Sequence, residues 1–336
     1  MRTLRMSLLG LAALALVLVP TGGAGASNDP SFKDQWGLTR IGAEAAWSRT
    51  TGAGIRIGIV DTGVDLEHED LAGKIVESTS CVGASGDPSK CKGTAQDDQG
   101  HGTHVSGIAA ALRDNGKGVA GVAPDAQLVV AKVLGASGTG SGQDVTAGIK
   151  WVVDRGAKIV NLSLGDPAQP ISVLISGNEL QEGVDYAWSR GAIPVIAAGN
   201  SNAGGLGIEG ANYGDMNAVV VGATGPDDKP TSYSTSTGAA KWAVVAPGGA
   251  GTPTRKSDDI YSTFWTSKEK NAYTWLAGTS MAAPHVSGAL ALLLAQGYAP
   301  EAAVTRLLDT ADQGVGCEAN SSTCRGRINL DRATAK

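Results

Sequence analysis

Short apolar runs alternate with helical patterns along most of the chain. The runs are rich in valine and isoleucine, which is typical of strands buried on both faces of a parallel sheet. They cover residues 55–61, 127–133, 159–162, 193–197 and 218–223. Segments with apolar residues at helical spacing lie between them, at residues 101–112, 144–155 and 180–190. The alternation predicts a three-layer α/β/α protein, in which helices cover both faces of a mainly parallel central sheet.

The longest helical segment covers residues 279–296, and small or apolar side chains lie almost all round it. A helix of this kind is normally buried in the core. Pro284 lies near its start, where the N–H groups of the first turn have no intrahelical partner, so we expect the helix to tolerate it. Two polar stretches, residues 83–99 and 248–270, are predicted to be loops. No linker, charge block or repeat divides the chain, so we expect one domain over residues 27–336.

The first 26 residues have the pattern of a secretory signal peptide. Arg2 and Arg5 precede a mostly apolar run at residues 7–19, and an A-x-A cleavage site follows at residues 24–26. The alternative is a membrane anchor, but the run is shorter than the about 20 residues that a membrane-spanning helix needs. We therefore expect a secreted, extracellular protein that has no membrane contact once the signal is removed.

The composition excludes several classes of protein. Hydrophobic residues make up 42% of the chain, which is too many for an intrinsically disordered protein. The 48 glycines follow no triplet repeat, so the chain is not collagen-like. With 27 basic and 32 acidic side chains the net charge is −5, which argues against nucleic acid as a partner.

Four cysteines allow three pairings, of which Cys81 with Cys91 and Cys317 with Cys324 close the shortest loops. An exported protein meets oxidising conditions, which favour disulfides over free thiols. A zinc site is less favoured, because neither pair has the C-x₂₋₄-C spacing.

Three residues with reactive side chains stand at the ends of predicted elements. Asp61 ends the first strand, beyond which ligands bind in open α/β sheets. His101 opens a helix that also carries His104; a metal site is the alternative for this pair, but no glutamate accompanies them as in H-E-x-x-H. Ser280 starts the long buried helix, where a serine is usually only a cap. Together the three could converge as nucleophile, base and orienting carboxylate.

These positions lie in segments that resemble the three signature motifs of the subtilases, the subtilisin-like serine proteases. The segments are Asp61-Thr62-Gly63, His101-Gly102-Thr103-His104-Val105 and Gly278-Thr279-Ser280-Met281-Ala282-Ala283-Pro284-His285. Their chain order of Asp, His and Ser is also that of the family. The resemblance extends from about residue 28 to residue 331, and it implies the subtilisin-like fold and a serine endopeptidase.

The resemblance also assigns roles to these residues. Ser280 is expected to attack the scissile carbonyl, His101 to act as general base and acid, and Asp61 to orient and stabilise the imidazolium. Asn200 lies in a segment that resembles the family's oxyanion segment. It is expected to donate its amide to the oxyanion, together with the N–H groups at the start of the Ser280 helix.

The expected substrates are polypeptides, bound as an added strand between two edge segments. One is the glycine-rich segment at residues 135–142, with Gly138 and Gly140, and the other is Ser163-Leu164-Gly165. The first appears two residues longer than in subtilisin, which leaves open which glycine pairs with the substrate. The small residues round the first pocket favour broad specificity with large uncharged side chains, and we expect a monomer.

Calcium is the expected cofactor. Asp29, Asp70 and Asn115 resemble the side-chain ligands of a subtilase calcium site, and Lys117 and Val119 are expected to contribute carbonyl oxygens. Oxygen ligands from a flexible loop suit the coordination of calcium. The alternative is a set of solvated surface acids next to a turn.

Other functions remain as alternatives. The segment that resembles the mature start of the family follows the signal directly, so we expect no inhibitory propeptide, and a dedicated processing protease like the mycosins is one alternative. A non-catalytic secreted binding protein on the same fold is another. An α/β-hydrolase esterase is disfavoured, because it would need G-x-S-x-G and the order Ser, Asp, His, whereas Ala282 replaces the second glycine and the order is Asp, His, Ser. A dinucleotide-binding protein is disfavoured too, because it would need G-x-G-x-x-G after its first strand, whereas Gly52-Ala53-Gly54 precedes that strand and lacks the third glycine.

Overall fold

The computed structural model describes residues 27–164, 172–174, 177–200, 213–318 and 321–336. The predicted signal peptide at residues 1–26 and the predicted substrate-binding residue Gly165 lie outside the described residues.

A nine-stranded sheet forms the centre of the protein, in the order β12-β13-β9-β8-β7-β5-β1-β3-β2. Neighbouring strands are parallel except for the antiparallel pair β12 and β13. The five predicted strands are β1, β3, β5, β7 and β8. The bounds are β1 Arg56–Asp61, β2 Ile75–Ser80, β3 Gln127–Lys132, β5 Ile159–Leu162, β7 Ile193–Ala197, β8 Val219–Thr224, β9 Trp242–Pro247, β12 Asp312–Gln313 and β13 Cys324–Arg327.

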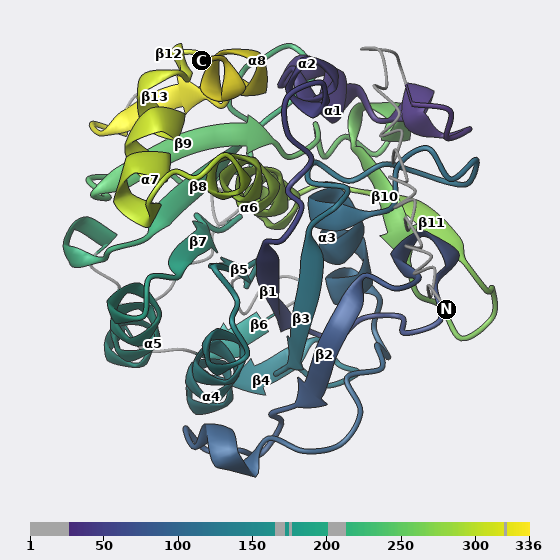
Figure 1. Ribbon diagram of the computed structural model, residues 1–336, viewed down its shortest axis with the longest axis vertical. Coiled ribbons are helices and arrows are strands. Elements are labelled where there is room, and N and C mark those ends of the chain that lie inside the picture. Colours follow the sequence, from purple (N-terminus) through teal and green to yellow (C-terminus); the bar gives the residue numbers. More distant parts are fainter. Residues whose placement is uncertain (1–26, 165–171, 175–176, 201–212, 319–320) are drawn as a thin grey trace, which may run out of the picture.

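Helices cover both faces of this sheet (Figure 1). Successive side chains of a strand point to opposite faces. In β1, Ile57 and Ile59 therefore join a core with α3 and α6, whereas Val60 joins a second core with α4 and α5. The predicted three-layer α/β/α architecture is confirmed. The helices are α1 Trp36–Arg40, α2 Ala43–Trp47, α3 His101–Ala110, α4 Gly142–Asp154, α5 Gly177–Ser189, α6 Thr279–Ala295, α7 Pro300–Asp309 and α8 Leu330–Thr334, with 3-10 turns at Phe32–Asp34, Glu69–Leu71, Pro88–Lys90, Tyr213–Asp215 and Lys256–Asp258.

Two further strand pairs lie outside the central sheet. β4 (Thr139–Ser141) pairs in parallel with β6 (Ser172–Leu174). β10 (Ile260–Phe264) and β11 (Ala272–Leu276) form an antiparallel hairpin.

The prediction of a loop over residues 248–270 is wrong for β10. The strand buries Ser262 and Thr263, whose hydroxyls donate to carbonyl oxygens of α3 at 2.9 and 2.7 Å. Two of its three buried side chains are therefore polar, which hides the strand from a search for apolar residues.

Pro284 is the sixth residue of α6, so the explanation from the first turn is wrong. A proline there removes the N–H that would bond to the carbonyl oxygen of Ser280, four residues earlier. The Ser163 hydroxyl donates to that oxygen instead, at 2.8 Å. The helix tolerates Pro284 because a side chain at the end of β5 replaces the missing donor.

The structure joins Cys81 to Cys91 and Cys317 to Cys324, which are the two local pairings. In the described parts of the chain, no helix is both long enough and apolar enough to cross a membrane.

Candidate active site

The predicted catalytic residues lie at the ends of central elements. Asp61 is the last residue of β1, and Asn200 follows the carboxyl end of β7 by three residues. His101 is the first residue of α3, and Ser280 is the second residue of α6. The carboxyl ends of parallel strands share one edge of the sheet, where open α/β folds bind their ligands.

Asp61 and His101 form a direct pair. The Nδ1 atom of His101 lies 2.8 Å from Oδ1 of Asp61, which also accepts the N–H of Thr62 at 2.7 Å. Asp61 is fully buried and His101 is 7% exposed. A carboxylate only accepts hydrogen bonds, so Nδ1 carries the proton and Nε2 is the basic nitrogen of the neutral ring.

A close approach between two backbone segments brings this pair together. A Cβ atom on Gly102 would lie 2.1 Å from the carbonyl oxygen of Gly63 and 3.2 Å from the Asp61 side chain. Any larger residue would push the first turn of α3 away from the end of β1. The Gly102 N–H also donates to the Thr62 hydroxyl at 2.9 Å, which fixes the two segments together.

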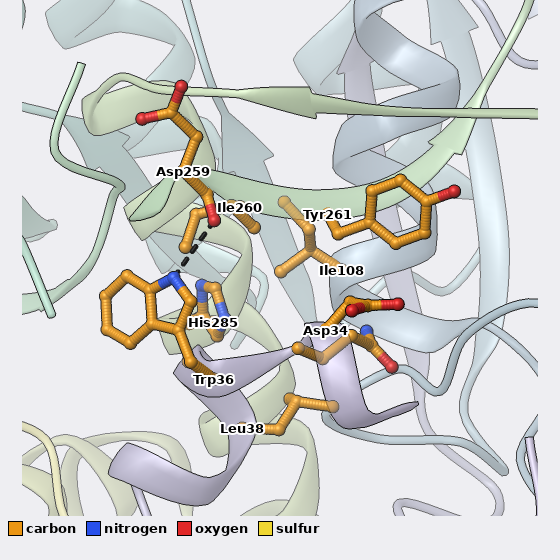
Figure 2. A pocket seen from close by; sticks show the side chains of 10 residues that line it. Asp34, Trp36, Leu38, Ile108, Asp259, Ile260, Tyr261 and His285 are labelled. Atoms are coloured by element: carbon orange, nitrogen blue, oxygen red, sulfur yellow. Dashed lines mark hydrogen bonds between the residues drawn. The ribbon is translucent and has the colours of Figure 1, made fainter. Parts of the chain in front are cut away.

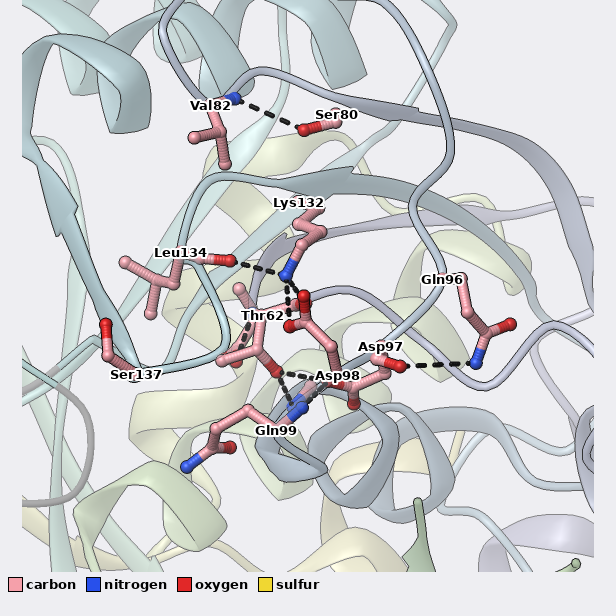
Figure 3. Close-up of polar contacts among 12 residues, drawn as sticks. Thr62, Ser80, Val82, Gln96, Asp97, Asp98, Gln99, Lys132, Leu134 and Ser137 are labelled. Atoms are coloured by element: carbon pink, nitrogen blue, oxygen red, sulfur yellow. Dashed lines mark hydrogen bonds and ion pairs between the residues drawn. The ribbon is translucent and has the colours of Figure 1, made fainter. Parts of the chain in front are cut away.

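The sequence analysis missed Asp97, a fully buried carboxylate that bonds to Thr62, the residue after Asp61 (Figure 3). Its Oδ1 accepts the Thr62 hydroxyl and the Gly100 N–H, each at 2.9 Å. Its Oδ2 accepts the hydroxyl and the N–H of Thr103 at 2.6 and 3.0 Å. A carboxylate four residues before His101, at a predicted helix start, is the signal that could have found it.

Ser280 is buried next to the end of β5. Its Oγ donates to the carbonyl oxygen of Ser163 at 3.2 Å, and the residue is 6% exposed. The hydrogen bonds of the described residues do not include one between Ser280 and His101. The structure thus pairs Asp61 with His101 and leaves the Ser280 hydroxyl bonded to the backbone.

Asn200 lies against the N-terminus of α6. Its Oδ1 accepts the N–H and the hydroxyl of Thr279 at 2.9 and 3.0 Å. A backbone N–H can only donate, so this contact determines which amide atom is the oxygen. The Nδ2 group of Asn200 is left to donate elsewhere, next to the residue that precedes Ser280.

A chain of hydrogen bonds between neutral polar groups connects the same helix to the end of β5. The Ser163 hydroxyl accepts the Asn161 amide at 2.8 Å and donates to the Ser280 carbonyl. Ser287, on the next turn but one of α6, donates to Oδ1 of Asn161 at 2.8 Å. All three supporting side chains are fully buried, and each polar contact fixes α6 to β5.

The predicted substrate-binding residues lie on two different kinds of segment. Gly140 is the middle residue of β4, and Gly138 lies in the preceding turn with φ +74°. Ser163 and Leu164 follow β5 and are buried. The extended part of residues 135–142 is thus limited to β4, because α4 begins at Gly142.

The predicted calcium ligands converge on the loop after residue 113. Asp29 accepts the N–H groups of Asp114 and Asn115 at 2.9 and 3.0 Å. Asp70 accepts the amide of Asn115 and the N–H of Val119, both at 2.8 Å. These donors occupy the carboxylate oxygens in the structure.

Two of the predicted ligands are buried carboxylates, which supply the oxygen ligands that a hard cation takes. Asp29 and Asp70 are 4% and 0% exposed, and neither forms an ion pair with a described residue. Their negative charge is therefore not balanced by a basic side chain. The Lys117 ammonium pairs with Glu69 at 3.1 Å, so only its carbonyl is available as a ligand. In the described residues, this loop included, no group of three or more His, Cys, Asp or Glu side chains could hold a metal, so any ligands beyond the two carboxylates would have to be amide or carbonyl oxygens.

The two remaining histidines of the signature motifs are structural. Burial lowers the pKa of His104 to about 3 and the pKa of His285 to about 4, so both are neutral near pH 7. The Nε2 atom of His104 lies 3.1 Å from the carbonyl oxygen of Thr274, and it faces the β10–β11 hairpin rather than Asp61.

His285 lines a small cavity with Trp36, whose Nε1 donates to the carbonyl of Asp259 at 2.9 Å (Figure 2). The cavity volume is about 10 Å³, close to the minimum that one water molecule needs. A peptide substrate therefore cannot bind there.

Comparisons with known proteins agree with this geometry. The model of the subtilase family matches residues 52–327. Thermitase from Thermoactinomyces vulgaris is 38% identical over 309 residues, which cover 91% of this chain and 98% of thermitase. Subtilisin Savinase from Lederbergia lenta is 41% identical over 259 residues, covering 77% and 83% of the two chains. A protease structure from Pseudoalteromonas arctica PAMC 21717 superposes with a TM-score of 0.77 at 29% identity, covering 92% and 99%.

Proposed function

The chain belongs to the subtilase family of serine endopeptidases, and from this membership we propose that it hydrolyses polypeptides with Asp61, His101 and Ser280. The observation that carries the proposal is the 2.8 Å hydrogen bond between Asp61 and His101 at the carboxyl end of β1. Family membership supplies the third member, because Ser280 lies in the matching segment of α6.

The reaction begins with the Ser280 hydroxyl. His101 takes its proton through Nε2 as Oγ attacks the scissile carbonyl, and returns that proton to the leaving amine. Asp61 holds the ring in the tautomer that presents Nε2, and its charge stabilises the imidazolium. A water molecule then attacks the acyl-enzyme while Nε2 of His101 takes a proton from it. His101 returns this proton to Oγ of Ser280 as the acid product leaves. For the first step the Ser280 hydroxyl has to turn away from the Ser163 carbonyl.

The negative oxygen of the tetrahedral intermediate is held by neutral donors. The first N–H groups of α6 have no intrahelical partner, and the positive end of the helix dipole lies there. The contact of Thr279 with Asn200 leaves the Nδ2 group of Asn200 as a second donor. Such donors are fixed before the reaction begins, so little reorganisation is required in the transition state.

The proposed substrate is an extended polypeptide of broad sequence. It pairs with the backbone near Gly138 and Gly140 on one side and with Ser163, Leu164 and Gly165 on the other. When a peptide N–H bonds to the Ser163 carbonyl, it competes with Ser280 for the same acceptor. Substrate binding would then release the nucleophile towards His101.

We also propose that the protein acts outside the cell as a monomer. Residues 1–26 would direct export as a signal peptide, and residues 27–336 would form one catalytic domain. The two disulfides support this location, because such bonds persist in oxidising compartments.

Calcium is the proposed stabilising ion of the loop after residue 113. Asp29, Asp70 and Asn115 would hold it with side-chain oxygens, and Lys117 and Val119 with carbonyl oxygens. Bound there, the ion would balance the buried charge of the two carboxylates.

A thermal unfolding experiment tests the calcium site. At a calcium concentration of about 100 times Kd, binding adds about 2.7 kcal/mol, so a chelator should lower Tm by about 4 °C in a domain of this size. The Asp70→Asn variant should lose this response to the chelator. An equal Tm with and without chelator in the wild type would refute the site.

Ser280→Ala is the direct test of the proposed function. Wild type should degrade casein and react with a fluorophosphonate probe, whereas the variant should do neither. Ser106→Ala is the matched control, since Ser106 is a buried serine of α3 whose hydroxyl donates to the Gly102 carbonyl. Activity that survives in Ser280→Ala would refute the mechanism. A few specific cuts in casein, instead of general degradation, would indicate a processing protease.

A further inference from the structure

One buried lysine contacts three segments of the candidate active site (Figure 3). Lys132 is the last residue of β3, and it lies beside Asp61 in the register of β1 and β3. Its ammonium donates to the carbonyl oxygens of Thr62 and Leu134 at 2.7 and 2.6 Å, and to Oδ1 of Asp98 at 2.7 Å. The residue is only 7% exposed.

Each of these acceptors lies close in sequence to a different functional part of the site. Thr62 directly follows Asp61, and Asp98 precedes His101 by three residues. Leu134 directly precedes the glycine-rich segment at residues 135–142. The ammonium therefore connects the acid, the base and one edge of the substrate cleft.

The contacts of Lys132 fit a single arrangement of these segments. An ammonium has three protons, and here each one has its own acceptor. Removal of an ammonium from water is costly, and the cost is offset only when all of its hydrogen bonds and its countercharge are in place. Displacement of any one segment would therefore leave a buried donor or carbonyl oxygen without a partner.

We propose that Lys132 is a positioning residue for peptide hydrolysis, which keeps Asp61 and the segment before His101 aligned when substrate binds beside residues 135–142. This inference rests on the proposed function. Lys132 contacts neither the substrate nor the reacting atoms, so it acts through Asp61 and His101. Its loss should lower kcat more than it changes KM, because Gly140 at the cleft edge is also held by the pairing of β4 with β6, which does not involve the ammonium.

The test compares Lys132→Met with Lys132→Arg and with Lys74→Met. Methionine keeps the apolar part of the side chain, whereas arginine restores a cation with several donors. Lys74 is the matched control, since it is 5% exposed and its ammonium donates to the Pro124 carbonyl. Lys74 directly precedes β2, at the opposite end of the strands from Asp61. The measurements are kcat and KM on a short chromogenic peptide, together with the unfolding midpoint of each protein.

We expect Lys132→Met to lower kcat by about 10- to 100-fold with KM changed less than about threefold, the loss that a small misplacement of catalytic groups causes. Lys132→Arg should recover most of this loss. Lys74→Met should lower the unfolding midpoint but leave kcat unchanged. If Lys132→Met and Lys74→Met both keep wild-type kcat, the proposal is overturned.

Two outcomes distinguish this proposal from the proposed function. Wild-type protein that neither cleaves the peptide nor reacts with a fluorophosphonate would overturn the proposed function. If Lys132→Met does not fold, Asp98→Asn provides the test, because Asp98 is exposed and its loss loosens the ammonium without removing it. We then expect kcat to fall about two- to fivefold, the range for a partly exposed ion pair, with KM unchanged. An unchanged kcat in Asp98→Asn would contradict the proposal.

Discussion

The two halves of the candidate active site are built from different kinds of groups. The acid–base half, made up of Asp61, Asp97, His101 and Lys132, contains ionised side chains that are buried or nearly so. The serine half is made up of Ser280, Thr279, Asn200, Ser163 and Asn161, and all of its side chains are neutral. The first half is organised round α3 and the second round α6, and these two helices pack against each other.

This difference matches the charges that develop during peptide hydrolysis. A positive charge forms on the imidazole, so a fixed carboxylate stabilises it. A negative charge forms on the substrate oxygen, and neutral N–H donors can stabilise it without a buried countercharge. Each half therefore has the electrostatic character that its own step requires, and the predictions below test this division.

Asp61→Asn should have the largest effect among the supporting residues. A neutral amide cannot stabilise the imidazolium, and it favours the wrong tautomer of His101, so we expect kcat to fall about 10⁴-fold with the fold intact. The measurement is kcat on a peptide substrate, with circular dichroism as the check on folding. A loss smaller than that of Asn200→Ala would break the comparison, because the charged half would then matter less than the neutral one.

Asn200→Ala should have the next largest effect. Loss of one oxyanion donor costs about 2.7–4 kcal/mol, or 10²- to 10³-fold in kcat, a magnitude that comes from subtilisin. KM should change little, because the donor acts mainly in the transition state. Thr279→Val is the control: it removes one contact to Oδ1 of Asn200 and leaves the Thr279 N–H in place. A large rise in KM with constant kcat would show that Asn200 binds substrate instead.

The sequence predicted five of the central strands and the signature residues for physical reasons, but β9 was missed although its sequence is equally apolar and buried. β1, β3, β5, β7 and β8 are buried on both faces, so they are short runs of apolar residues. β2 was missed because it is an edge strand in which one residue is buried, and β13, next to the edge strand β12, because it contains two arginines and a glycine. Strands at the edge of a sheet have no continuous apolar pattern to detect.

The supporting residues of the site could not be predicted in this way. Asp97 and Lys132 are charged, and a charged residue in a sequence is normally a solvated one. Their burial depends on acceptors and donors that lie more than 30 residues away, such as Thr62 in both cases. Asp61, His101 and Ser280 were found because their motifs combine a reactive residue with small neighbours, which permit close approach of the backbone.

Acid should destabilise both halves through one buried, non-catalytic histidine on each helix. His104 of α3 and His285 of α6 have pKa values lowered by burial to about 3 and about 4. The unfolded chain binds protons to both below about pH 6.5, whereas the folded protein does not. Stability is therefore complete above about pH 6.5 and is lost as the pH falls towards 4. At pH 5 the loss should be about 2 kcal/mol for each histidine.

His104→Gln and His285→Gln test this contribution separately. Glutamine can donate to the same carbonyl oxygens but does not titrate. Each variant should lose less stability than the wild type between pH 7 and pH 5, as measured by urea unfolding at the two pH values. If only one of the two variants shows this effect, the acid sensitivity belongs to one half alone.

Ser163→Ala should change stability rather than the chemical step, and the size of the change depends on a difference between the two helices. In α6 the Ser280 carbonyl has no helical partner, because Pro284 lacks an N–H, so removal of the Ser163 hydroxyl leaves a buried oxygen and the Asn161 amide unsatisfied. We expect unfolding to become easier by about 1–3 kcal/mol, measured by urea denaturation. Ser106→Ala is the counterpart in α3. The Ser106 hydroxyl donates to the Gly102 carbonyl, but in the helix that oxygen also accepts the N–H of residue 106. The loss of stability in this variant should therefore be smaller. Equal losses in the two variants would mean that the Ser280 carbonyl finds another donor and that Ser163 is not needed to hold the start of α6 in place.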